Sequence, residues 1–334
     1  MRKMMRSDVE NNDKVPCYFC QGRYFNLLIS ALDFDNGKES FDLMECAQCR
    51  LVRTEPILSP AQLQKYYALP YYGAGKEKFK GLAETITYWL NYRRAGVVLS
   101  HLESRPGFSA GIPPRILDVG CGRGNLLRIL NDKGCACYGV ERTDFPENGL
   151  SKGIHFFKGN LNELLFEDNF FDAVVLWHVL EHTENPIGIV QETARILHPG
   201  GLLVVAVPNF GSFQAKLFQA EWFHLDLPRH TYHFSSETLL QCLSRTGFEV
   251  IKRSTFSIEQ NPFGFIQSFF NKIPRAKPNR FYSLLKKIDS PSSFFSLLVW
   301  AGFAFLIFPF ALLEYLISGI LGKGATLLVY AKKH

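Results

Sequence analysis

The stretch Ile116-Leu-Asp-Val-Gly-Cys-Gly-Arg-Gly-Asn125 decides the fold of this chain. It begins as a buried strand, turns through three glycines and enters an amphipathic helix that ends near Leu130. Such glycines let a ligand approach the backbone closely, and the helix start offers free N–H groups to a carboxylate. Asp118 stands directly before the turn, where its carboxylate can reach an amino group of the ligand. The G-x-G-x-G spacing departs from the G-x-G-x-x-G of dinucleotide sites, so the downstream chain must identify the ligand.

Further apolar runs alternate with helical patterns, which predicts an α/β fold with a parallel sheet. The second strand ends at Glu141, where a carboxylate can accept hydrogen bonds from both hydroxyls of a ribose. Ala325 to Ala331 reads as a last, antiparallel strand whose partner is the run from Phe248 to Thr255. The intervening strands are expected at residues 136–140, 154–157, 171–177 and 202–207.

Four motifs occur together along this part of the chain. They are D-x-G-x-G-x-G at 118–124, the acid that ends the second strand, F-D-x-V-x-x-x-x-V-x-E-H at 171–182 and the turn L-x-P-G-G at 197–201. This set resembles the class I S-adenosylmethionine-dependent methyltransferases. The resemblance implies a Rossmann-like sheet of seven strands whose last strand is antiparallel, and transfer of a methyl group from S-adenosylmethionine.

The resemblance also implies which residues hold the cofactor. The methionine part would lie over the first acid and the glycine turn, and the ribose would bind the acid that ends the second strand. Near the adenine the family usually has Asp, whereas this chain has Asn, which can still accept a hydrogen bond. A tryptophan at the end of the fourth strand would pack near the cofactor or, alternatively, fill the core. The implied residues are Asp118, Gly120, Gly122, Gly124, Glu141, Asn160, Leu161 and Trp177.

Four of the eight cysteines form two C-x-x-C pairs near the N-terminus. Four thiolates on two such turns suit a tetrahedral zinc ion, and the spacing is typical of a zinc ribbon over residues 16–54. A disulfide clasp and two fortuitous pairs are the alternatives. In similar ribbon-bearing methyltransferases the second pair is usually followed by Gly-Leu, whereas here Arg50 takes the place of the glycine. The predicted zinc ligands are Cys17, Cys20, Cys46 and Cys49.

The net charge of +6 is concentrated in one segment. Six basic residues and no acid lie between Gln260 and Ile288, so the remainder is neutral, which argues against a nucleic-acid partner. Residues 1–15 are charged and polar and predict a disordered tail instead of a secretory signal. We therefore expect a reduced, cytoplasmic chain.

A helical cover segment is expected over residues 55–110, before the methyltransferase core at 111–260. Ser59 would cap a short helix that ends at Tyr67, and a long amphipathic helix would follow. This long helix would pack against the sheet and partly cover the cofactor. It is predicted to run from Lys76 to Glu103, with Phe79, Leu82, Ile86, Leu90 and Val97 on its apolar face.

A group of polar residues follows the carboxyl ends of the strands, where open α/β sheets place their ligands. His178, Glu181 and His182 share one face of a helical turn, and Asp226 and His230 lie in a later loop. One hypothesis takes His178 as the general base, with His224, Asp226 and His230 shaping the acceptor pocket. A second has His178, Glu181, His182 and His230 bind a divalent cation, a pattern that resembles metal-dependent members of the superfamily. A third gives these histidines structural roles such as helix capping.

Residues 261–323 form a basic and apolar insertion before the final strand at 324–334. Phe294 to Leu313 comprises 20 residues without a charge, long enough to cross a hydrocarbon core. Because the strands on both sides belong to one sheet, the chain must return, which excludes a single span. Pro309 favours a re-entrant or interfacial helical hairpin, attached monotopically to the inner face of the membrane. A buried helical subdomain and a homodimer interface are the alternatives.

The predicted function is methyl transfer to an oxygen, or less readily a carbon, of a glycan, lipid-linked or quinone-like acceptor at the membrane surface. Methyl transfer requires mainly that the nucleophile be aligned with the S–CH3 bond of the cofactor. A soluble sugar C- or O-methyltransferase with an apolar dimer interface is one alternative. A non-catalytic membrane-bound scaffold with a degenerate methyltransferase fold is another.

Overall fold

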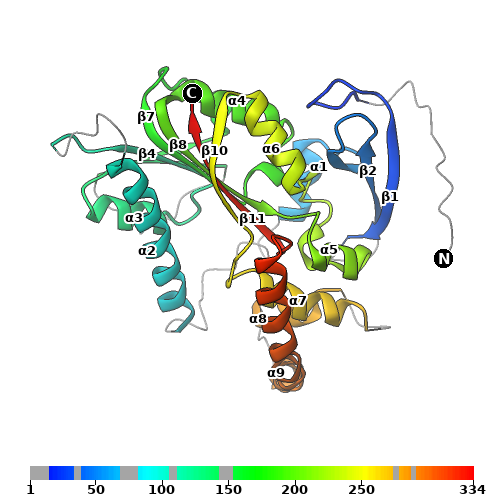
Figure 1. Ribbon diagram of the computed structural model, residues 1–334. Coiled ribbons are helices and arrows are strands. Elements are labelled where there is room, and N and C mark those ends of the chain that lie inside the picture. The colour runs from blue at the N-terminus through cyan, green and yellow to red at the C-terminus, as the bar shows by residue number, and fades with distance from the viewer. Residues whose placement is uncertain are drawn as a thin grey trace.

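The computed structural model describes residues 15–33, 39–67, 82–104, 111–142, 153–273, 278–286 and 291–334. The predicted tail up to residue 14, the predicted helix start at Lys76 and parts of the basic stretch lie outside these residues. Figure 1 shows a large twisted sheet with helices on both faces, a small sheet beside it and a helical module that extends from one end.

The large sheet confirms the predicted fold. Its seven strands are β4 (Arg115–Val119), β5 (Ala136–Glu141), β6 (Ile154–Lys158), β7 (Phe171–Trp177), β8 (Leu197–Pro208), β10 (Phe248–Ser254) and β11 (Thr326–Lys333). They lie in the order β10-β11-β8-β7-β4-β5-β6, with β4 to β8 parallel and β11 antiparallel to both of its neighbours. β8 begins at Leu197, within the predicted turn, because Leu197 already pairs with Phe171.

Each face of this sheet has its own core, because successive strand residues point to opposite sides. One face is covered by α2 (Leu82–Glu103) and α3 (Asn125–Asp132), and the other by α4 (Pro186–Ile196) and α6 (Ser236–Arg245) (Figure 1). Thus Ile116 packs with the first pair of helices, and its neighbour Leu117 packs in the other core. Because helices cover both faces of the sheet, polar groups that bind a ligand are expected at the ends of its strands.

The structure confirms the long helix over α2 but changes its buried face. Its buried side chains are Asn91, Ala95, Val98 and Leu102, whereas the predicted core residue Ile86 is 50% exposed. The second half of α2 packs against α3 and the sheet, whereas its beginning reaches past the sheet (Figure 1). Among the residues that the structure describes, no element covers the first half of α2 and buries an apolar face there.

The small sheet contains the N-terminal strands β1 (Phe25–Leu32), β2 (Ser40–Cys46) and β3 (Val52–Glu55). Its fourth strand, β9 (Tyr232–His233), comes from the part of the chain that builds the large sheet and pairs antiparallel with β3. A buried hydrogen bond of 2.7 Å from Thr54 Oγ1 to the carbonyl oxygen of His230 joins the two parts further. Ser59 then caps α1 (Pro60–Gln64), as predicted, and a 3-10 turn ends at Tyr67.

A helical module connects β10 to β11. It consists of α7 (Asn261–Asn271), α8 (Arg280–Lys286) and α9 (Pro291–Ile320), with α7 and α8 both packed on α9. α9 is one continuous 30-residue helix through Pro309, so the apolar stretch does not form the predicted hairpin by itself. A proline inside a helix removes one backbone hydrogen bond and favours a kink without ending the helix here. The hairpin is instead made by α7 and α9.

Shorter helices complete the described part of the chain and carry loops around the strand ends. They are η3 (Leu161–Glu163), η4 (Leu180–His182), α5 (Phe213–Phe218), η5 (Gln219–Glu221) and η6 (Phe223–Leu225).

Candidate functional site

The predicted cofactor residues meet at one edge of the large sheet. Val119, the last residue of β4, pairs with Val140 of β5 on one side and with Leu176 of β7 on the other. Since these strands are parallel, the residues that follow them reach the same edge. We call the carboxyl ends of β4, β5, β7 and β8 the cofactor edge.

The glycine turn at this edge requires glycine at each position. Gly120, Gly122 and Gly124 have φ values of +69°, +53° and +69°, a left-handed conformation that side chains disfavour. A Cβ on Gly120 would lie 2.8 Å from Val179, and one on Gly124 would lie 3.0 Å from Phe156. A Cβ on Gly122 would meet nothing within 4 Å. The middle of the turn therefore borders open space in which a ligand can lie against the backbone.

Glu141 is tied to the glycine turn by its carboxylate. It accepts hydrogen bonds from the backbone N–H of Gly122 at 3.0 Å and of Arg142 at 2.8 Å. Arg142 also donates from Nε to Asn160 Oδ1 at 2.6 Å, and Leu161 is buried beside this loop. Asn160 thus lies next to Glu141, and its amide oxygen is already held by Arg142.

Asp118 is buried at the end of β4, close to the guanidinium of Arg94, a residue that we did not predict from the sequence. Burial raises the pKa of Asp118 to about 7, and the nearby guanidinium of Arg94 partly offsets this effect. Arg94 also stacks on Trp177, 3.5 Å from the ring centroid, and forms an ion pair with Glu259. Arg94 lies on the side of α2 that carries the buried residues, whereas its neighbour Arg93 is exposed. This position on the helix is the one sequence signal that could have identified Arg94.

His178 follows β7 directly and has the features of an oriented base. Its Nδ1 lies 2.9 Å from Glu181 Oε1, and its buried Nε2 has no hydrogen-bond partner among the residues that the structure describes. Burial would raise the pKa of Glu181, but the hydrogen bond and charge of His178 outweigh burial, and the pKa falls to about 2. An ionised carboxylate on Nδ1 fixes the tautomer in which Nε2 carries the lone pair. The φ of His178 is +55°, a strained conformation that clusters at functional sites.

Glu181, His182 and His230 come together, with one ligand atom from each within 4.8 Å of the others. His182 Nδ1 lies 3.1 Å from the carbonyl oxygen of Arg229, and His230 Nδ1 lies 2.9 Å from that of His224. Because a carbonyl only accepts, both rings carry the proton on Nδ1 and present the lone pair of Nε2. Glu181 Oε2 is buried without a partner. Three of the four predicted cation ligands therefore come together in the structure. The fourth, His178, is hydrogen-bonded to Glu181 and is not part of this group.

Asp226 lies in the loop before β9 and is engaged by Arg229. Its Oδ2 accepts from Arg229 Nε at 3.0 Å and lies 3.8 Å from His230 Nε2. Burial would raise the pKa of Asp226, but the charge of Arg229 holds it well below its usual range. Asp226 therefore fixes the loop that carries His230.

The four predicted zinc ligands form a second cluster, with their sulfur atoms within 4.8 Å of one another. The Cys17–Cys49 and Cys20–Cys46 sulfur pairs are each 3.5 Å apart, too far for a disulfide bond. Tetrahedral zinc with Zn–S bonds of about 2.3 Å places its sulfurs about 3.8 Å apart. The cluster is consistent with a zinc site.

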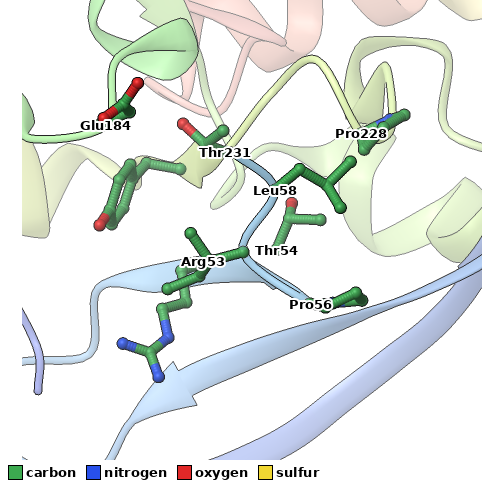
Figure 2. Close-up of a pocket in the computed structure, with 9 residues that line it drawn as sticks. Arg53, Thr54, Pro56, Leu58, Glu184, Pro228 and Thr231 are labelled. Atoms are coloured by element: carbon green, nitrogen blue, oxygen red, sulfur yellow. The ribbon is translucent and has the colours of Figure 1, made fainter. Parts of the chain in front are cut away.

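A small pocket lies at the seam between the small sheet and the core. Figure 2 shows it lined by Arg53, Thr54, Pro56 and Leu58 from one side and by Glu184, Pro228 and Thr231 from the other. It contains no predicted cofactor, catalytic or metal residue, and it borders the loop of His230.

Comparisons with known proteins agree with this site. The family model described as "Methyltransferase domain" matches residues 90–253. A protein of Mycolicibacterium smegmatis named "Probable S-adenosylmethionine-dependent methyltransferase" is 32% identical over 189 residues, which cover 55% of this chain and 66% of that protein. The ubiquinone biosynthesis O-methyltransferase of Maricaulis maris is 29% identical over 195 residues, with 54% and 74% covered. The ubiquinone/menaquinone biosynthesis C-methyltransferase of Vibrio parahaemolyticus is 28% identical over 180 residues, with 45% and 67% covered.

These matches span about two thirds to three quarters of each relative. The family match begins in α2 and ends in β10, so it contains the glycine turn, Glu141 and the His178–His182 turn. The seven-stranded sheet with its antiparallel last strand agrees with this match. The chain therefore belongs to the class I S-adenosylmethionine-dependent methyltransferases.

Proposed function

We propose that this methyltransferase acts on an oxygen of a glycan, lipid-linked or quinone-like acceptor at the inner face of the membrane. The observation that carries the proposal is the His178–Glu181 pair, whose free Nε2 lies at the cofactor edge. The alternative of a non-catalytic scaffold does not account for a half-buried histidine that is oriented by a buried carboxylate. Methylation of carbon is the second chemistry, since relatives of both kinds share this fold.

The residues of the cofactor edge fit S-adenosylmethionine, which supplies an electrophilic methyl group on its sulfonium. We assign the methionine part to the open side of Gly122, between Gly120 and Gly124. Asp118 would accept from the amino group, and Arg94 would neutralise the carboxylate. The remaining assignments are Glu141 to the ribose, Asn160 and Leu161 to the adenine, and Trp177 to the wall of the cofactor pocket.

His178 would remove the proton of the acceptor hydroxyl through Nε2. Glu181 holds Nδ1–H and stabilises the imidazolium that forms, the division of labour of a carboxylate–histidine pair. Asp226 and His230 would shape the acceptor side, because Asp226 and Arg229 fix the loop beside His182 and His230.

A divalent cation is a second candidate for the same region. Two imidazole Nε2 atoms and the free Glu181 Oε2 offer a two-histidine, one-carboxylate ligand set, which suits several divalent metals. Such an ion would bind the acceptor oxygen and favour its ionised form. Dialysis against a chelator and readdition of Mg²⁺, Mn²⁺ or Zn²⁺ would distinguish this role from that of His178 alone.

The membrane part of the proposal rests on α9. It is the one helix of the described chain that is long and apolar enough to cross a membrane, with a mean hydropathy of 2.3 and 11% of its apolar window buried. Thirteen large apolar side chains of α9 are exposed, from Phe294 to Ile320. Thr326 of β11 pairs with Pro208 at the end of β8, so α9 meets the sheet at the cofactor edge. An apolar helix at this edge would bring the site to a membrane-bound acceptor. A dimer interface formed by α9 is the alternative.

We also propose that Cys17, Cys20, Cys46 and Cys49 hold a structural zinc ion. All four positions are thiols, which leaves no open coordination site for catalysis. The bonds from Thr54 to the His230 loop give this ribbon a second role, since it supports the acceptor side of the site.

The test of the proposed chemistry is replacement of His178 by alanine. Incorporation of label from methyl-labelled S-adenosylmethionine into lipids of the source membrane should fall by about 10²–10⁴-fold. Cofactor binding measured by calorimetry should stay within about twofold, because Nε2 does not hold the cofactor. Glu181→Gln should show a smaller loss of turnover. His198→Ala, at the opposite edge of the sheet, is the matched control, and unchanged turnover in His178→Ala would reject the base assignment.

A further inference from the structure

The first half of α2 presents an exposed aromatic face. Ile86, Tyr88, Trp89 and Tyr92 are 50%, 59%, 53% and 47% exposed. Tyr88, Trp89 and Tyr92 recur at helical spacing and so lie on one side of the helix. Burying side chains of this size contributes roughly 1.5–3 kcal/mol each, so their exposure together indicates a surface meant to be covered. We call these four residues the α2 patch.

Basic side chains accompany the aromatic rings of the α2 patch. The guanidinium of Arg93 lies 4.9 Å from the centroid of the Trp89 ring. The ammonium of Lys133 in the loop after α3 lies 4.6 Å from that of Tyr92 and 3.4 Å from its hydroxyl. Tryptophan and tyrosine with adjacent Arg and Lys are the composition that favours the headgroup region of a bilayer. The positive charges add attraction to anionic lipid.

The α2 patch lies on the same side of the molecule as α9. In Figure 1 both helices extend from the same end of the large sheet, with α7 and α8 beside α9. Arg94 of α2 forms an ion pair with Glu259, which directly precedes α7, so the two parts are joined. Further basic residues in the described part of the module are Lys272 and Arg280, which are exposed. The exposed aromatic residues of α2 and the exposed apolar residues of α9 therefore belong to helices that leave the sheet at the same end.

We infer that the α2 patch is a second contact with an anionic lipid bilayer, placed beside the α9 contact. This inference rests on the proposed attachment of α9 to the membrane. Two separate contacts fix the orientation of the molecule, so the cofactor edge between them faces the bilayer. The acceptor class that fits is an amphiphile that enters from the bilayer and whose methylated group lies at the level of the headgroups.

Binding of the full chain to vesicles tests the inference without any need for the acceptor. Vesicles of phosphatidylethanolamine and phosphatidylglycerol serve as the probe, and phosphatidylcholine vesicles as the neutral comparison. The variant Trp89→Ser/Tyr92→Ser should partition about tenfold less than the unmodified chain, and both should bind neutral vesicles more weakly. The matched control is Tyr24→Ser/Leu32→Ser, because Tyr24 and Leu32 are 60% and 48% exposed on the small sheet. This control should bind as the unmodified chain does.

A second readout locates Trp89 itself. Brominated lipid should quench more of the fluorescence of the unmodified chain than of Trp89→Phe, because the other three tryptophans are retained in both. Equal quenching, or equal partitioning of Trp89→Ser/Tyr92→Ser and the unmodified chain, would overturn the inference and leave α9 as the contact. Loss of a dimer in this variant on sedimentation, without loss of vesicle binding, would overturn it in favour of a second copy of the chain. Failure of the unmodified chain to bind vesicles would contradict the proposed membrane attachment as well, whereas cofactor binding would be unaffected.

Discussion

Two residues of the cysteine ribbon adopt a conformation that favours glycine. Gln21 follows Cys20 with a φ of +61°, and Arg50 follows Cys49 with a φ of +67°. Each residue closes an equivalent turn, in which its N–H bonds to the carbonyl oxygen of the first cysteine of its pair. The sequence departure at Arg50 therefore has a physical cost, since a side chain here strains the backbone by about 1 kcal/mol or more.

Arg50→Gly should raise the free energy of unfolding by about 0.5–1 kcal/mol, because glycine adopts a positive φ without strain. Gln21→Gly should act in the same direction. Arg50 also forms an exposed ion pair with Glu45 at 2.9 Å, which is worth little at a surface. Glu45→Gln removes only that ion pair and serves as the control in urea unfolding. Destabilisation by both glycine variants would contradict the strain argument.

Single residues also mark where prediction from the sequence ends. The spacing of His178 and Glu181 correctly implied one face, but only the fold shows that the carboxylate is buried and leaves Nε2 free. Arg94 escaped prediction because its importance comes from Asp118 and Trp177, on two other elements. Local periodicity carries no information on such long-range partners.

Among the elements, α7 links the helical module to the histidine loops. A Cβ on Gly264 would lie 2.3 Å from His224 Nε2, and Ser268 Oγ accepts from the N–H of Phe223 at 2.9 Å. α7 is thus held closely against η6, which leads into the Asp226–His230 loop. If the module binds a membrane as proposed, its movements would reach the proposed acceptor side through this contact.

Gly264→Ala should lower the free energy of unfolding by about 1–3 kcal/mol, since the added methyl group forces His224 or α7 to move. It should also reduce turnover more than cofactor affinity, because His224 lies on the acceptor side. Gly96→Ala is the matched helical control, as its Cβ would meet nothing within 4 Å. That variant should be neutral or stabilising by up to about 1 kcal/mol. Equal effects of the two changes in urea unfolding would exclude the proposed close contact.

Helices and strands could be predicted from the sequence where the hydrophobic pattern was long. What each of them packs against could not. The strands of the large sheet follow from apolar runs, and the cap of α1 follows from Ser59. The apolar face of α2 was predicted correctly at Val97, which packs on the core, and wrongly at Ile86, which is exposed. An apolar stripe has the same pattern whether it contacts a sheet, a membrane or solvent. Pro309 was expected to accompany a hairpin, but the helix continues through it and packs on α7.

At the scale of the whole molecule, buried neutral histidines make folding dependent on pH. Burial lowers the pKa of His182 to about 4 and those of His224 and His233 to about 3, from 6.5 in the unfolded chain. Between these values the unfolded chain binds more protons, so stability falls as pH falls below about 6.5. Asp118 acts oppositely, since its raised pKa lets the folded chain bind a proton in this range. The three protons that the histidines bind only in the unfolded chain outnumber the one that Asp118 binds only in the folded chain, so the net effect of acid is destabilisation.

The free energy of unfolding should therefore decrease by about 2–2.5 kcal/mol per pH unit between pH 6 and pH 5. Urea unfolding at several pH values measures this slope. His233→Asn should make the slope shallower, because one of the three buried imidazoles is then absent from both states. Stability that is constant or greater at pH 5 would contradict the assignment of these histidines as buried and neutral.

The central claim is that the glycine turn, Asp118 and Glu141 form an S-adenosylmethionine site, and isothermal calorimetry with that cofactor tests it most directly. We predict one site per chain with a dissociation constant between about 1 μM and 1 mM, the usual range for enzyme substrates. Glu141→Ala should weaken it by about tenfold or more, through loss of two ribose hydrogen bonds. Absence of binding by the folded, unmodified chain at millimolar cofactor would contradict the account.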